Sequence, residues 1–229
     1  MKILQMISSV AIATSIATVA AIVSPVTANA ATFTFDNIAG GDTFGDGLNG
    51  FLSMDVTDSG NGVLFKFNNA IGNTATNSFI GTVYIDGSTT LLLNSIAVNY
   101  ANVGVDVDFS GGTGNGNLSQ SANLATAFTT DYDFTKKGGA SNGVNKGESL
   151  GVLFAGANFN NVISAINDGS LRVGYHLQGL PNDKSDSYVN SRTTGTTPTP
   201  VPVPGFLVGV MAAGALGGTR LLKNKKQAV

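Results

Sequence analysis

Short runs of alternating apolar and polar residues, separated by clusters of Gly, Asn, Asp and Ser, fill the chain from residue 31 to about residue 190. Residues 103–109 (Val-Gly-Val-Asp-Val-Asp-Phe) alternate most strictly, and residues 63–67 place Lys66 between two phenylalanines. Successive side chains point to opposite faces of a strand, so such runs predict half-buried β-strands. The expected strands are residues 31–36, 51–57, 62–67, 78–86, 91–98, 104–109, 128–134, 150–154 and 171–178.

The spacing of these runs predicts an all-β fold, because strands that recur every ~8–15 residues with turn signals between them are typical of a sandwich. We expect a single β-sandwich or jelly-roll-like domain over residues 31–190, flanked by an N-terminal signal peptide and a C-terminal hydrophobic helix. Only residues 160–167 have the pattern of a short helix, which Asp168-Gly169 ends. The expected core consists of Phe33, Phe35, Leu64, Phe65, Phe67, Val83, Ile85, Val105, Val107, Leu153, Phe154, Ile166, Leu171, Val173 and Leu177.

Residues 1–30 have the three parts of a secretory signal peptide. Lys2 supplies the basic start, an apolar stretch runs from residue 10 to residue 23, and Pro25 follows it. Ala28-Asn29-Ala30 then places small side chains where signal peptidase requires them, which predicts cleavage before Ala31. The alternative is an uncleaved membrane anchor. The pattern predicts export by the secretion machinery.

The chain ends in three parts of different composition. Residues 191–204 form a Thr/Pro-rich linker, whose prolines predict an extended, semi-rigid spacer. Residues 205–222 are apolar and approach the ~17–25 residues of a transmembrane helix. Residues 223–229 form a basic cytoplasmic tail, because positive residues beside a span stay inside, which leaves the domain outside. The alternative is a soluble helix packed on the domain. The basic stop consists of Arg220, Lys223, Lys225 and Lys226.

This order of parts resembles the PEP-CTERM sorting signal of exported bacterial proteins. The resemblance covers about the last 35 residues, and its central motif is Val201-Pro202-Val203-Pro204-Gly205. It implies that an exosortase, a membrane enzyme, cuts near the prolines and hands the protein to the cell surface. Many family members accompany systems for exopolysaccharide or biofilm matrix. The family commonly has Glu between the two prolines where this chain has Val203, a departure that bears on whether the tail is cut.

A second resemblance lies at residues 174–180 (Gly-Tyr-His-Leu-Gln-Gly-Leu), which Ser185-Asp186-Ser187-Tyr188 follows. It resembles a segment near the end of many exported bacterial sandwich domains with this kind of tail. The resemblance implies the fold class and no reaction. His176, the only histidine, shares a strand face with Gln178, and we interpret it as a structural residue hydrogen-bonded to a turn.

The formal net charge of −2 hides an uneven distribution. Residues 31–197 carry seven Lys or Arg and fourteen Asp or Glu side chains, a net charge of −7, whereas the C-terminus is basic. An acidic domain argues against a nucleic-acid partner, which needs a basic surface. The chain has no Cys and one His, so most nucleophile–base pairs are unavailable and we expect no enzyme activity.

Two pairs of aspartates, Asp106/Asp108 and Asp131/Asp133, have the spacing that puts both carboxylates on one strand face, about 7 Å apart. Inverting glycosidases hold their two catalytic carboxyl groups ~6.5–9.5 Å apart, so the distance allows hydrolysis. However, such enzymes usually line a sugar-binding cleft with aromatic residues, and this chain has no Trp. We interpret these acids as solvated strand faces and expect no cofactor, with calcium and catalysis as alternatives. The candidate calcium ligands are Asp42 and Asp46, in a glycine-rich loop over residues 40–47, together with Asp106 and Asp108.

These patterns together predict an exported, non-catalytic protein of the cell envelope or extracellular matrix, membrane-tethered or sorted to the cell surface by its tail. Its expected partners are the secretion machinery, an exosortase-like sorting enzyme, the membrane through the C-terminal helix, and extracellular polysaccharide bound by loops. The alternatives are a calcium-dependent adhesin and a carbohydrate-active enzyme that uses a carboxylate pair. The sequence leaves the ligand and the oligomeric state open.

Overall fold

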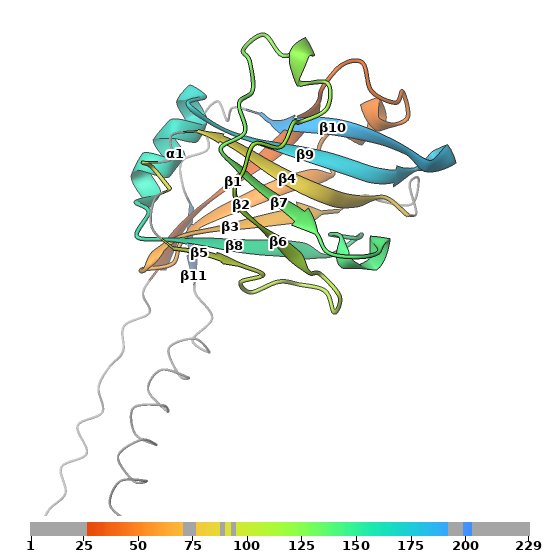
Figure 1. The fold of residues 1–229 in the computed structure, drawn as a ribbon. Coiled ribbons are helices and arrows are strands. Elements are labelled where there is room, and N and C mark those ends of the chain that lie inside the picture. The colour runs from red at the N-terminus through yellow and green to blue at the C-terminus, as the bar shows by residue number, and fades with distance from the viewer. Residues whose placement is uncertain (1–26, 71–76, 88–89, 93–94, 192–198, 203–229) are drawn as a thin grey trace, which may run out of the picture.

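The computed structural model describes residues 27–70, 77–87, 90–92, 95–191 and 199–202. Strands dominate these residues, together with one α-helix and four short 3-10 helices, η1 to η4 (Figure 1). The elements are β1 Thr27–Asn37, η1 Gly45–Leu48, β2 Leu52–Asp58, β3 Gly62–Asn69, β4 Phe79–Gly87, β5 Ile96–Val98, β6 Phe109–Thr113, η2 Ser121–Asn123, β7 Tyr132–Lys136, η3 Ala140–Asn142, β8 Ser149–Ala155, α1 Phe159–Asp168, β9 Leu171–Leu180, η4 Pro181–Asp183, β10 Lys184–Asn190 and β11 Thr199–Pro202.

The strands pair antiparallel in one sheet that curls until it is nearly closed (Figure 1). Their order is β5-β8-β3-β2-β1-β10-β9-β4-β7-β6, and β11 pairs only with the start of β1. Residues 30–34 of β1 pair with β2, whereas residues 35–37 pair with β10, so β1 joins two halves. We call β5, β8, β3 and β2 the first half, and β10, β9, β4, β7 and β6 the second half. The predicted all-β class with one short helix is confirmed.

Alternation of apolar and polar residues gives the strands an inner and an outer face. In β3, Val63, Phe65 and Phe67 are fully buried, whereas Lys66 between the two phenylalanines lies on the outer face. The burial of each such apolar side chain stabilises the fold by about 1.5–3 kcal/mol. The predicted strand over residues 62–67 is thus confirmed, and its hydrophobic period sets which face forms the core.

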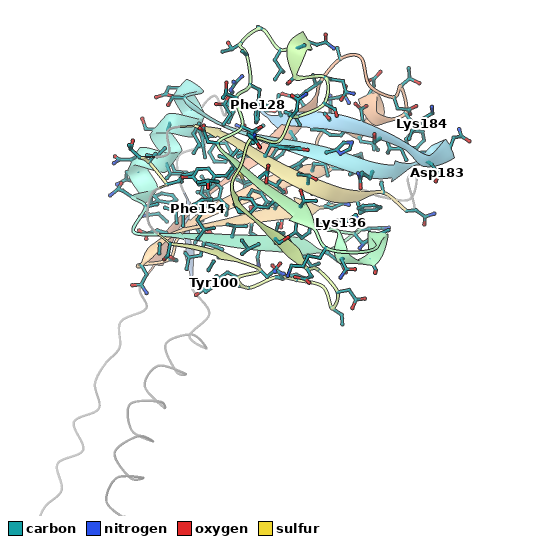
Figure 2. All side chains as sticks on the ribbon, viewed as in Figure 1. Tyr100, Phe128, Lys136, Phe154, Asp183 and Lys184 are labelled. Carbon is teal, nitrogen blue, oxygen red and sulfur yellow. The ribbon has the colours of Figure 1, made fainter. Side chains whose placement is uncertain are left out.

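Aromatic rings from the two halves meet in the core. Phe35 of β1 stacks on Tyr175 of β9, with ring centroids 3.8 Å apart. Phe154 of the first half contacts Tyr132 and Phe134 of the second half edge-on, at 5.7 and 6.2 Å between centroids, and lies inside the molecule (Figure 2). Such aromatic pairs contribute about 0.5–1.5 kcal/mol each beyond the area that they bury. The core therefore fixes the two halves face to face.

Helix α1 begins and ends where the sequence provides caps. The Oδ1 atom of Asn158 accepts a hydrogen bond from the main-chain N–H of Asn161, which satisfies one of the free donors of the first turn. Gly169 ends the helix with φ 81°, a left-handed conformation that glycine adopts without strain. The predicted helix over residues 160–167 is confirmed, and it buries Val162 and Ile166.

The run with the strictest alternation is not a strand, which corrects the prediction for residues 104–109. Residues 99–108 form a loop, and the chain enters β6 only at Phe109. Val105, expected in the core, is 98% exposed. Gly104 has φ 116°, which a regular strand excludes. Alternation fails here because no strand runs alongside this segment: its main-chain hydrogen bonds go partly to the amides of Asn99 and Asn102 and partly to single main-chain groups such as those of Ser149.

Other differences are smaller. Of the expected strand over residues 91–98 only Ile96–Val98 is a strand, and β7 begins at Tyr132 rather than at residue 128. Leu64 and Leu153 are half-buried because they lie on the outer face, and apart from Val105 the rest of the expected core is buried. The sequence pattern does not predict β10, since its middle is polar, although Asp186 and Ser187 are fully buried.

The sheet has two distinct ends. Ser191 donates its main-chain N–H to the carbonyl of Thr34 at 2.8 Å, and β11 pairs with residues 27–30 of β1. We call this side the terminal end, because the chain enters and leaves the sheet there (Figure 1). The opposite side, the loop end, carries the 38–51, 99–108 and 137–148 loops and the turn at residues 181–183.

Candidate functional site

Exposed apolar side chains gather at the loop end. Among the described residues, the large hydrophobic side chains that are exposed are Phe51 (39%), Tyr100 (45%), Val103 (46%) and Val105 (98%). Phe51 directly precedes β2 and the other three belong to the 99–108 loop, so all four lie at one end of the sheet. Exposed apolar groups that gather in one place mark interaction sites, whereas scattered ones need no explanation. The loop end is therefore the candidate site.

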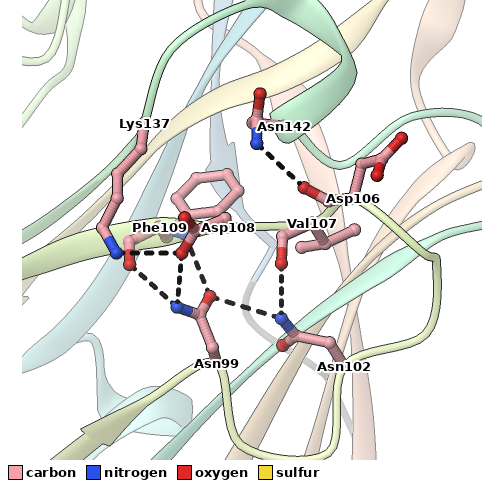
Figure 3. Close-up of polar contacts among 8 residues, drawn as sticks. All are labelled: Asn99, Asn102, Asp106, Val107, Asp108, Phe109, Lys137 and Asn142. Atoms are coloured by element: carbon pink, nitrogen blue, oxygen red, sulfur yellow. Dashed lines mark hydrogen bonds and ion pairs between the residues drawn. The ribbon is translucent and has the colours of Figure 1, made fainter.

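The side chain of Asn99 holds the 99–108 loop in place (Figure 3). Its Oδ1 atom accepts a hydrogen bond from the N–H of Phe109 at 2.9 Å. Its Nδ2 atom donates to the carbonyl of Phe109 at 2.9 Å and to Oδ1 of Asp108 at 3.0 Å. The amide thus pairs with both main-chain groups of Phe109, as a neighbouring strand would. Because β5 and β6 are the two end strands of the sheet, this side chain bridges the gap in the nearly closed sheet.

Asn102 and Val103 fix the middle of the same loop. The Nδ2 atom of Asn102 donates to the carbonyl of Val107 at 3.0 Å, and its Oδ1 atom accepts from the N–H of Gly151 at 2.8 Å. Val103 exchanges two main-chain hydrogen bonds with Ser149 at the start of β8. These bonds already hold the loop in one conformation. A partner that binds it therefore does not have to order it, which lowers the entropic cost of binding.

The carboxylates of Asp106 and Asp108 do not form a pair on one strand face, which corrects that interpretation. Asp106 is exposed, and its main-chain carbonyl accepts a hydrogen bond from Asn142 (Figure 3). The Oδ1 atom of Asp108 accepts from Asn99 and lies 3.0 Å from the Nζ atom of Lys137. Asp108 therefore ties the loop to the 137–148 segment.

The second pair, Asp131 and Asp133, also holds the chain together. An oxygen of Asp131 accepts a hydrogen bond from the N–H of Gly87 at 2.8 Å, at the end of β4. An oxygen of Asp133 accepts from the N–H of Gly116 at 3.0 Å. The carboxylates of Asp131 and Asp133 are thus anchored to different turns.

Asp42 and Asp46 lie in the loop that folds over Asp186 of β10. Asp186 is fully buried, and its two oxygens accept hydrogen bonds from the N–H of Ser187 and from Asn37, each at 2.8 Å. Burial raises the pKa of Asp186; the two hydrogen bonds lower it, and the negative charges of Asp46 and Asp42 raise it again. This side of the loop end therefore concentrates negative charge.

The four carboxylates predicted as calcium ligands do not come together. Asp42 and Asp46 lie beside β10, whereas Asp106 and Asp108 precede β6 on the other side of the loop end (Figure 1). In the part of the chain that the structure describes, no group of three or more His, Asp or Glu side chains could hold a metal ion. The four residues thus belong to two separate regions.

His176 lies on the outer face of β9, in register with Thr82 of β4 and Ser187 of β10. Its imidazole is half-buried, and it forms no hydrogen bond with any described residue. The prediction of a structural hydrogen bond to a turn is therefore wrong. Burial lowers the pKa of His176.

The predicted targeting residues lie at or beyond the limits of the described chain. Ala28 and Ala30 belong to β1 and pair with Val201 and Thr199 of β11. Cleavage before Ala31 would remove the residues with which β11 pairs. No helix in the described ranges is long and apolar enough to cross a membrane. Pro202 ends β11, and the other residues of the sorting motif and basic stop, Val203, Pro204, Gly205, Arg220, Lys223, Lys225 and Lys226, lie outside the described residues.

Sequence reasoning missed Asn99 and Asn102, which organise the candidate site. The signal for them is faint: two asparagines three residues apart directly after a short apolar run. An Asn side chain carries the same donor and acceptor pair as a peptide group, so it can replace a missing strand. Pattern analysis reads only side-chain polarity and therefore does not detect this substitution.

Comparison with protein-family models, with curated proteins and with solved structures finds no match for this chain. Its function is therefore argued from its own residues and their geometry.

Proposed function

We propose that this chain is an exported, non-catalytic protein of the cell surface or extracellular matrix, displayed with its loop end facing outwards. The position of the chain ends carries the proposal. Ser191 leaves the sheet at the terminal end, hydrogen-bonded to Thr34. A linker and a membrane helix that follow Ser191 would hold the domain by that end. The exposed Tyr100 and Val105 would then point away from the membrane.

The C-terminal tail acts in this proposal as a PEP-CTERM-like sorting signal for an exosortase-like enzyme. The test is the intact mass of the native protein after cell fractionation. A species that begins at Ala31 and ends near Pro204, recovered from the outer surface or the medium, would support sorting. A species that retains residues 220–229 in the inner-membrane fraction would contradict cleavage and leave a tail-anchored envelope protein.

The proposal includes a finer description of the fold, namely a two-layer β-sandwich of the jelly-roll type. Its support is the contact of aromatic rings from the two halves, such as Phe154 with Tyr132. Sandwich domains place their variable loops at the ends of the layers, where ligands bind without disturbing the core. The loop end fits that arrangement.

Extracellular polysaccharide is the ligand class that we propose for the loop end. Tyr100 offers an exposed ring in a loop that hydrogen bonds hold in place, and the carboxylate of the nearby Asp108 binds Asn99 and Lys137. Tyr100→Ala should reduce retention of the protein on polysaccharide purified from the producing cells. Thr129→Ala, an exposed position outside the loop end, is the matched control. Equal retention of both variants and the native chain would contradict this ligand.

A calcium-dependent adhesin remains the second candidate, favoured by the concentration of negative charge around Asp186. Calcium bound to Asp42 or Asp46 would offset that charge and stabilise the native state. Millimolar Ca²⁺ should then raise the Tm while the same concentration of Mg²⁺ leaves it unchanged. An identical response to both ions would exclude this candidate.

A further inference from the structure

One long connection crosses the outer face of the second half between two anchored points (Figure 1). We call residues 117–124, which include η2, the strap. Before it, Gly116 donates its N–H to a carboxylate oxygen of Asp133 at 3.0 Å. After it, Arg172 donates to the carbonyl of Thr126 at 2.9 Å. Both anchors lie outside the strap, so the strap can move while they stay in place.

The strap itself contacts the rest of the domain at two places, one on the sheet and one on the 38–51 loop. Leu118 packs on Gly174 of β9, so closely that a Cβ atom at this glycine would collide with the leucine. Asn123 donates to the carbonyl of Ala39 at 2.6 Å. The residue before Ala39 donates its N–H to the carbonyl of Ser187 in β10. The strap therefore runs from β9 to the far side of β10 and passes over Ser187.

Two polar atoms in this region are buried without a hydrogen bond. They are the Oγ atom of Ser187 and the Oε1 atom of Gln120, in the middle of the strap, and among the described residues no other side-chain oxygen or nitrogen shares this state. Each such atom is less stable than in its hydrated form, because it has lost its hydrogen bonds to water without replacing them. Gln120 also has φ 58°, a left-handed conformation that costs a residue with a side chain more energy. The conformation in which the strap lies on the sheet, which we call closed, thus contains three unfavourable features: two unpaired buried atoms and one left-handed residue with a side chain.

His176 borders the same covered region. It is the register partner of Ser187, so the two side chains lie side by side on the outer face, about 5 Å apart at Cβ. The titratable or charged groups on this face are Tyr84 and Asp86 of β4, Asp133 of β7, Arg172 of β9, which pairs with Asp86, and Asp36 of β1. The strap contributes none, and Asp186 of β10 points to the inner face. None of these groups shifts the pKa of His176, which burial alone lowers. A protonated imidazole at this position would be more stable in contact with water than half-buried.

We propose that the strap is a pH-dependent cover that opens when His176 binds a proton and exposes the polar row formed by Thr82, His176 and Ser187. Opening gives the imidazolium ring access to water and lets water bind the unpaired oxygens of Ser187 and Gln120. Because a neutral His176 is favoured in the closed form, the open fraction grows as the pH falls below about 6.5. This device is independent of the proposed ligand at the loop end.

Amide hydrogen exchange of the full-length protein tests the proposal. After correction for the intrinsic pH dependence of exchange, protection of residues 118–123 should fall at least about threefold between about pH 7.5 and about pH 5. Protection of β3 should not change. In His176→Gln, which cannot titrate there, the strap should keep the same protection at both pH values. A native strap whose protection is equal at both pH values would overturn the proposal.

A second pair of variants separates a strained cover from a merely mobile loop. Ser187→Ala and Gln120→Gly each remove an unpaired polar atom from the closed form, and glycine also relieves the left-handed backbone. Protection of the strap should therefore increase in both variants at neutral pH. If Ser187→Ala lowers protection instead, the hydroxyl stabilises the closed form and the account of an unfavourable cover is wrong.

Discussion

The 99–108 loop and the strap are both irregular segments laid against outer faces of the same sheet, yet they differ in how their polar groups are satisfied. In the loop, the amides of Asn99 and Asn102 bond to main-chain groups of the adjoining strands. In the strap, Gln120 buries its amide oxygen without a partner, and Ser187 of β10 buries an unpaired hydroxyl. One segment is fixed by its asparagines, whereas the other is strained by its glutamine.

This difference teaches how a rigid fold provides two kinds of surface. A segment whose asparagine amides bond to the adjoining strands can present exposed side chains such as Tyr100 in one arrangement. A segment with unpaired buried atoms lies closer in energy to an open form, because water can satisfy those atoms. Length and polarity do not distinguish the two segments, and only their hydrogen bonds do.

The largest effect is expected from Asn99→Ala. The change removes both hydrogen bonds to Phe109 and the one to Asp108, so the bridge between β5 and β6 is lost. We expect the free energy of unfolding to fall by about 2–3 kcal/mol. Urea unfolding measures it, with Asn115→Ala in an exposed loop as the control. A loss no greater than that of the control would refute the bridging role of Asn99.

Gly151→Ala should have the next largest effect, because a Cβ atom there would overlap the main-chain oxygen of Tyr100. The loop would have to move away from β8, and we expect a loss of about 1–3 kcal/mol of stability. Gly47→Ala is the control, since its Cβ would meet no atom within 4 Å. Thermal unfolding of the two variants compares them directly, and equal melting temperatures would show that the loop is not fixed to β8.

A smaller effect is expected for His176→Gln, and only in acid. The folded pKa of His176 lies below its unfolded value, so the native state binds fewer protons and stability is lost as the pH falls below about 6.5. Between about pH 7.5 and about pH 5 the native protein should therefore lose more stability, or gain less, than the variant does. The raised pKa of Asp186 changes stability with pH in the opposite direction, but it does so equally in both proteins, so its contribution cancels in the comparison. Parallel pH profiles of the two proteins in urea would contradict this assignment.

The smallest effect is expected from Lys137→Met, at the edge of the 99–108 loop. The ion pair with Asp108 is about half exposed, with side-chain exposures of 53% and 42%, so water and salt screen it. Its loss should cost about 0.5 kcal/mol or less. A larger loss in urea unfolding would mean that the charge, rather than the asparagine amides, holds the loop.

Much of the fold could be predicted from hydrophobic period alone. Residues 62–67 and 171–178 are strands because alternation matches a buried inner face. The same rule fails at residues 103–109, where Val105 is exposed, because no continuous strand pairs with that loop and side-chain amides take part of its main-chain hydrogen bonds. It also misses β10, whose Asp186 and Ser187 are polar but buried beneath neighbouring loops. Polarity predicts exposure only where no loop covers the strand.

The candidate site was less accessible to sequence reasoning. Asp106 and Asp108 attract attention as a pair, but the structure uses Asp108 to bind Asn99 and Lys137. The register of His176 with Ser187 depends on β10, which the sequence pattern does not predict. Contacts between residues far apart in the chain set the chemistry of these groups, and no local pattern encodes them.

The central claim, outward display of the loop end, has a direct test because the chain contains no Cys. Val105→Cys introduces one thiol at the most exposed apolar position of the loop end, and Lys225→Cys introduces one in the basic tail. A membrane-impermeant maleimide on intact producing cells should label the first variant and not the second. Labelling of Val105→Cys only after the cells are broken would contradict outward display.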